Sequence, residues 1–80
     1  TSFVLGVNGE GIAEVPVIQL VEKLREIDSF SSIVMDGIVT QRVVDMALSK
    51  KANVVVGERI GELEKRPSGL SIMTIREIAA

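Results

Sequence analysis

Two acidic residues, Asp36 and Glu58, are the first candidates for chemistry in this sequence. Each follows a short apolar run, and the carboxyl ends of parallel strands are where α/β sheets gather their ligands. A carboxylate at such an edge can bind Mg²⁺, but Gly37 and Ile38 stand where a second local acid would complete the site. We favour a turn or helix cap formed by Asp36 and Gly37. A carboxylate pair between Asp36 and Glu58 is the alternative.

The usual parts of enzyme sites are missing from the sequence. It contains no histidine and no cysteine, which excludes the common catalytic triads, thiol chemistry and zinc ribbons. The spacing of Gly57 and Gly61 does not match a dinucleotide-binding loop, and Lys65–Gly69 is not a phosphate-binding loop. Phe3 and Phe30 are too few aromatic residues for a base-stacking platform. We therefore expect no catalytic residue, no metal site and no cofactor in this chain.

Composition and charge describe one globular domain over residues 1–80. An apolar content of 46% excludes intrinsic disorder, and a net charge of −2 gives no bulk attraction to nucleic acid or to a membrane. No apolar run approaches the roughly 20 residues of a membrane span, and the lack of cysteine fits a cytoplasmic location. The sequence begins at Thr1 without a methionine, so we expect it to be a fragment of a longer protein.

The segment Ser31–Gly57 is the centre of the predicted fold. Its pattern predicts a strand near 32–36, a helix from about Thr40 to Lys50, and a second strand at 54–57. Both strands are apolar without alternation, so we expect them to be parallel and covered on both faces. The hydroxyl of Thr40 is expected to cap the helix.

The residues before this segment predict a hairpin and a helix. The arms at 2–7 and 12–15 flank Asn8-Gly9, the pair that favours a type I′ turn. Pro16 then begins a helix that extends to Asp28, with apolar residues at helical spacing.

After the second strand come a long loop at 57–69, a strand at 71–75 in either direction, and a short tail at 76–80. The whole order is ββαβαβ. It predicts a small α/β domain of two or three layers, with a mostly parallel sheet and an N-terminal hairpin.

The loop Gly57–Gly69 is the predicted docking surface, because loops of this length are often functional. An apolar Ile60 beside Arg59 has little local reason to be buried and resembles an interface anchor. Leu63 and Leu70 either join this surface or pin the loop to the sheet, and two cations further along would form a charged rim. The predicted partner-binding residues are Arg59, Ile60, Leu63, Lys65 and Arg66.

Two blocks of the sequence resemble a known family. MDGIVTQRVVDMA starts at Met35, and ANVVVGERIGELEKRPSGLSIMTIREI starts at Ala52. Both resemble the C-terminal domain of archaeal DnaG-type primases, and the match at Asp36–Arg42 is the most specific. The resemblance extends from Val15 to Ile78 and implies that the chain is a C-terminal fragment of a longer DnaG-type protein.

The resemblance implies a parent protein with Mg²⁺-dependent primase chemistry in a Toprim domain. It also implies membership of the RNA-degrading exosome, binding of adenine-rich RNA, and attachment through the cap subunit with an S1-type domain. The family's catalytic acids lie upstream in the Toprim motifs, and nothing here matches them. We therefore expect a docking module, with a structural or metal-assisting part of the primase core as the alternative. The replicative helicase is a further candidate partner, and RNA is expected to bind only through the rest of the parent.

Overall fold

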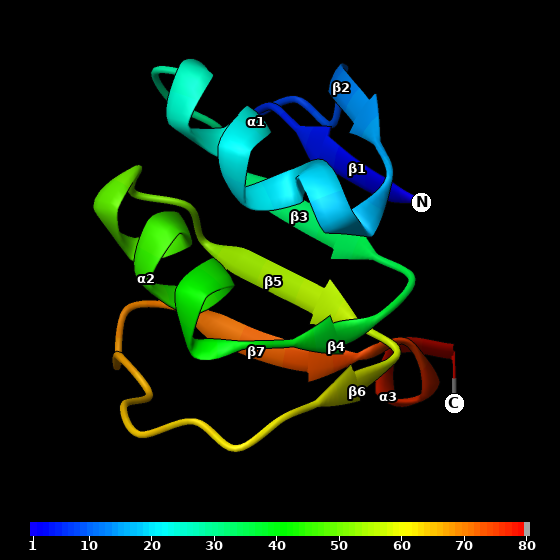
Figure 1. Cartoon of the computed structure of the whole chain (residues 1–80), viewed down its shortest axis with the longest axis vertical. Helices are drawn as coiled ribbons and strands as arrows, with labels where there is room; N and C mark the ends of the chain where they lie inside the picture. Colours follow the sequence, from blue (N-terminus) through cyan, green and yellow to red (C-terminus); the bar gives the residue numbers. More distant parts are fainter. Residues whose placement is uncertain (80) are drawn as a thin grey trace.

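A five-stranded mixed sheet forms the frame of the computed structural model, which describes residues 1–79 (Figure 1). Its strands are β1 (Ser2–Leu5), β2 (Gly11–Val15), β3 (Ser32–Met35), β5 (Val54–Gly57) and β7 (Ser71–Thr74). In space they follow the order β2-β1-β3-β5-β7. β1 is antiparallel to both of its neighbours, whereas β3, β5 and β7 are mutually parallel. The predicted ββαβαβ order and mixed α/β class are confirmed, and the last strand runs parallel to β5.

The two main helices lie side by side on one face of this sheet (Figure 1). The first begins as the short 3₁₀ helix η1 (Val17–Gln19) and continues as α1 (Leu20–Glu26), and the second is α2 (Gln41–Ser49). The domain therefore has two layers. The apolar run of the valine strand predicted cover on both of its faces but left open whether the two helices share a face, and the structure places α1 and α2 on the same side.

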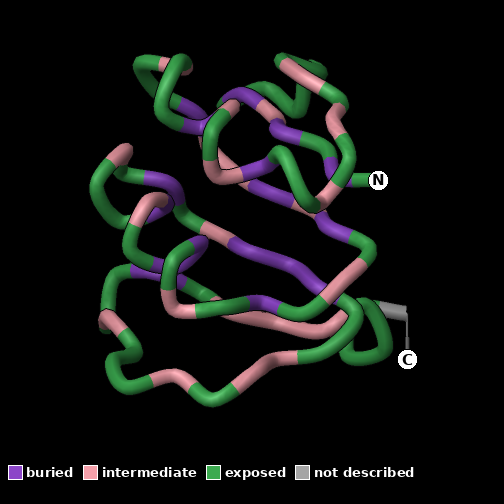
Figure 2. Tube along the Cα trace, viewed as in Figure 1, coloured by how far each residue is buried: buried purple, intermediate pink, exposed green. Residues whose placement is uncertain are grey.

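The core fills the space between the sheet and the two helices (Figure 2). The apolar stripe of α1 places Leu20 and Leu24 in full burial, as its 3.6-residue period requires. Burial of a leucine side chain contributes about 1.5–3 kcal/mol. The remaining buried apolar residues of this cluster are Val4, Phe30, Ile33, Met35, Val39, Val43, Val44, Ala47, Ala52, Val55 and Leu70.

The N-terminal hairpin forms as predicted, but its turn differs. Gly6 N donates to Glu10 O at 2.8 Å and Gly9 N donates to Gly6 O at 2.9 Å, which closes a three-residue loop. Within this loop only Gly9 takes a positive φ, of 81°, so the loop is not the type I′ turn expected from Asn8-Gly9. Ile12 in β2 has no partner in the pairing, so the register shifts between Val4 and Leu5 and the two arms pair despite their unequal lengths.

Several boundaries also differ from the sequence expectations. The first helix ends at Glu26 rather than Asp28. Thr40 precedes α2, but its hydroxyl makes no capping hydrogen bond. The expected tail is instead the short helix α3 (Ile75–Ala79), and the expected loop contains part of a second, two-stranded sheet. Within residues 1–79, no helix has the length and apolar character to cross a membrane.

Candidate functional site

The carboxyl ends of the three parallel strands meet at one edge of the sheet. There the chain leaves β3 into β4 (Ile38–Val39) and leaves β5 into β6 (Arg59–Ile60), and these two short strands pair in parallel. Glu58 N donates a hydrogen bond to Gly37 O at 2.9 Å, which holds the residues that follow β3 against those that follow β5. Elements distant in sequence are thus held at one edge, which we call the carboxyl edge.

Two glycines permit this close approach. A Cβ on Gly57 would lie 2.5 Å from Val39 Cγ2 and 3.0 Å from Gly37 O. A Cβ on Gly61 would lie 3.0 Å from Ile38 Cγ2 and 3.1 Å from Val39 O. The glycines of the sequence GERIG therefore serve packing between β4, β5 and β6.

A cleft of about 750 Å³ opens at the carboxyl edge. Asp36 follows β3 and Glu58 follows β5, so the structure brings together the two acids that the sequence singled out. Two arginines line the same cleft, one from β6 and one from α3. The lining residues are Asp36, Glu58, Arg59, Thr74, Ile75 and Arg76.

This cleft does not fit a metal ion. A divalent cation would need several oxygen ligands, and it would face the charges of Arg59 and Arg76 beside only two carboxylates. Across the described residues, no group of three or more His, Cys, Asp or Glu side chains is placed to hold a metal. The Mg²⁺ implied by the family resemblance therefore has no set of ligands here, and we derive no chemical step through it.

Sequence reasoning missed the contribution of α3 to the cleft. Thr74 Oγ1 accepts a hydrogen bond from Glu77 N at 3.2 Å, while Thr74 N donates to Glu77 Oε1 at 3.2 Å. This reciprocal pair is a capping box, and it begins a helix that brings Ile75 and Arg76 to the carboxyl edge. The signal was present in the sequence, because Thr74 is followed three residues later by a glutamate.

The predicted docking residues do not form one continuous patch. Arg59 is exposed and lines the cleft. Ile60 is half-buried because it pairs with Val39 in the small sheet, so the local sequence was a poor guide to its burial. Leu63 packs against the core and Leu70 is 6% exposed, which supports the view that these two leucines pin the loop.

Lys65 and Arg66 are both exposed, and the loop that carries them is held by α2. Gln41 Oε1 accepts a hydrogen bond from Lys65 N at 3.0 Å, and Gln41 Nε2 donates to Lys65 O at 3.3 Å. Gln41 Nε2 also donates to Asp45 Oδ1 at 2.9 Å. One side chain at the start of α2 thus fixes the middle of the loop.

Apolar side chains are exposed beside the cleft. Ile38 is 50% exposed and pairs with Arg59 across the small sheet, while Ile75 is 41% exposed within the cleft lining. We call the set Ile38, Arg59, Ile75 and Arg76 the carboxyl-edge surface. It combines exposed apolar area with arginine, the mixture that interface anchors favour.

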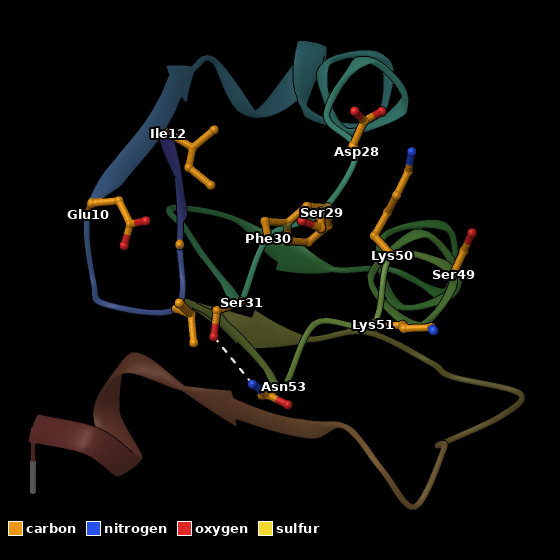
Figure 3. Close-up of a pocket in the computed structure, with 12 residues that line it drawn as sticks. Glu10, Ile12, Asp28, Ser29, Phe30, Ser31, Ser49, Lys50, Lys51 and Asn53 are labelled. Atoms are coloured by element: carbon orange, nitrogen blue, oxygen red, sulfur yellow. Dashed lines mark hydrogen bonds between the residues drawn. The ribbon is translucent and has the colours of Figure 1, made fainter.

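A second hollow, of about 530 Å³, lies at the opposite, amino edge of β3 and β5 (Figure 3). Asn53 Nδ2 donates to Ser31 Oγ there at 3.3 Å, and Lys50 Nζ donates to Arg25 O at 3.5 Å. Lys50 and Lys51 share the hollow with the acids Glu10 and Asp28, so its charges are balanced. No chemistry predicted from the sequence falls at this edge.

Known proteins resemble this chain over most of its length. A DNA primase DnaG from Pyrobaculum neutrophilum is 46% identical over 68 residues, which are 84% of this chain and 17% of the relative. The DNA primase DnaG of Archaeoglobus fulgidus is 40% identical over 79 residues, or 98% of this chain and 20% of the relative. That of Thermofilum pendens is 37% identical over 71 residues, or 89% of this chain and 17% of the relative.

The chain is therefore related to a segment of the archaeal DnaG primases, and the resemblance seen in the sequence is confirmed. It spans about a fifth or less of the length of these relatives. No protein-family model matches the chain. No solved structure matches it either.

Proposed function

We propose that this chain is a protein-docking domain, the C-terminal part of a longer DnaG-type protein. It attaches that protein to the RNA-degrading exosome through the cap subunit with an S1-type domain. The rest of the parent supplies primase chemistry with Mg²⁺ in its Toprim domain and binds adenine-rich RNA. The replicative helicase is the second partner to test, and the cytoplasm is the compartment in which these partners work.

The observation that carries the docking proposal is the carboxyl-edge surface. Exposed isoleucines are costly to leave in water, and a partner that covers Ile38 and Ile75 gains about 25 cal/mol for each Å² of apolar area buried. Arg59 and Arg76 flank them and supply donors for a carboxylate or for carbonyl groups on a partner. The relation to DnaG primases supports a place within a larger protein.

Arg59 is the residue at which to test the proposal. Its exposure means that substitution leaves the fold intact, whereas Ile60→Asp would also disturb the small sheet. We expect Arg59→Glu to weaken binding of the S1-domain cap subunit at least tenfold, about 1.4 kcal/mol. Isothermal titration calorimetry of the chain with that subunit measures the change, with a parallel titration of the helicase.

Arg25→Glu is the matched control, because Arg25 is exposed on α1 and the charge change is identical. We expect this variant to bind as the unmodified chain does. Equal affinity for Arg59→Glu together with lost binding for Arg25→Glu would move the docking surface to α1.

A further inference from the structure

The face of the five-stranded sheet opposite α1 and α2 carries a row of apolar side chains. The strand register pairs Phe3 with Val34, Val34 with Val56, and Val56 with Met73. Because side chains alternate along a strand, these four residues point away from the core residues Val4, Ile33, Val55 and Ile72. Four adjacent strands thus contribute one residue each to what we call the apolar row.

This face has almost no charge. The strands β1, β3, β5 and β7 contain no charged residue at all. Glu14, opposite Phe3 on the outer strand β2, is the acid that borders the row. A sheet face that stays in water normally alternates apolar-in with polar-out, so a face with this composition indicates that something covers it.

Phe3 is the most informative member of the row. It is 42% exposed although it lies near the middle of the sheet, between β2 and β3. The inner members are less open, since Val34 and Met73 are half-buried and Val56 is 5% exposed. The uncovered area is therefore concentrated on the side of the sheet formed by the hairpin.

The size of the face limits what can cover it. Five strands of four or five residues, spaced about 4.8 Å apart, give the whole face a footprint of roughly 300 Å², of which the hairpin side is the open part. A stable complex between free proteins buries about 800 Å² on each partner. Contacts between domains of one chain bury as little as about 600 Å² in total, or half of that on each side. Two domains of one chain also have a high effective concentration for each other, because the chain links them. A second copy or a free partner lacks this advantage.

We propose that the apolar row is the surface on which this domain packs against the remainder of its own longer chain. This rests on the part of the proposed function that places the chain within a DnaG-type protein, and it is independent of the exosome partner. The relatives supply the occupant, because the matched segment is 17% to 20% of their length and the rest of the chain is always present beside it. The occupant has an apolar, uncharged surface that buries Phe3. The carboxyl-edge surface stays free for a separate partner.

The test uses the full-length protein with Phe3→Lys, which places a charge at the exposed side of the row. We expect limited proteolysis to cut between this domain and the rest at least ten times faster than in the unmodified protein. Ile18→Lys is the matched control, because Ile18 is 91% exposed on η1 and lies outside this face. It should leave the cleavage rate unchanged.

Denaturant unfolding of the isolated chain shows whether either substitution damages the domain itself, and equal unfolding midpoints are expected. If Phe3→Lys does unfold the isolated chain, Phe3→Ser in the full-length protein gives the same comparison.

Cleavage at the control rate in a folded variant would overturn the proposal. So would an isolated chain that is a dimer in light scattering and dissociates on Phe3→Lys, because a second copy would then cover the row. Loss of cap-subunit binding with unchanged cleavage would assign the face to that subunit. Failure of cap binding in the unmodified protein would contradict the docking proposal and leave this one standing.

Discussion

At the residue scale, Gly57 is the position where the choice of side chain most directly decides the geometry of the cleft. Its missing Cβ leaves room for Val39 and for the carbonyl of Gly37 where β5 passes into β6. The sequence showed the glycine but offered no reason for it, because the contacts come from residues distant along the chain. The sequence also placed Asp36 at the end of a strand, but it did not show that two arginines lie in the same cleft.

Gly57→Ala should lower the free energy of unfolding by about 1–3 kcal/mol, because the added methyl group must displace Val39 or the backbone of Gly37. Gly69→Ala is the control, with nothing within 4 Å of the added atom. It should change stability by less than about 0.5 kcal/mol. Urea unfolding of both variants measures the difference. Equal free energies of unfolding would show that the residues after β3 and β5 do not pack closely around Gly57.

At the element scale, the periodicity of apolar residues predicted the two main helices and the strands of the five-stranded sheet correctly, whereas the local sequence did not predict the hairpin turn or the burial of Ile60. The apolar stripe of α1 and the valine run of β5 were readable because burial follows their repeat. The hairpin turn was misjudged, because the three-residue loop closes through Gly6 and Glu10 rather than Asn8-Gly9. Ile60 was misjudged because pairing of β4 with β6 is a long-range event with no local signature.

The loop between β6 and β7 depends on Gln41. Gln41→Ala removes both hydrogen bonds to the backbone of Lys65, each worth about 0.5–1.5 kcal/mol. We expect the amide of Lys65 to exchange with deuterium at least tenfold faster, and the free energy of unfolding to fall by no more than the contribution of these two hydrogen bonds. Gln41→Glu keeps the acceptor for this amide and should exchange at an intermediate rate. Arg42→Ala, at the exposed next position, is the control. An unchanged rate in Gln41→Ala would mean that Leu63 alone holds the loop.

At the scale of the whole molecule, placement of both helices on one face gives the domain two separate surfaces. The carboxyl edge gathers charged and apolar side chains from β4, β6 and α3, while the opposite sheet face carries the apolar row. The sequence predicted the order of the elements along the chain but left the side of each helix open, because continuous apolar runs do not say which face a helix covers. That choice depends on the packing of α1 against α2.

The most direct test of the docking account is amide NMR of the isotopically labelled chain during titration with the S1-domain cap subunit. The account predicts the largest changes at the carboxyl edge, at Ile38, Arg59 and Arg76, and little change at the amino edge, at Lys51 and Asn53. A spectrum without changes at saturating subunit, or changes confined to the amino edge, would contradict it.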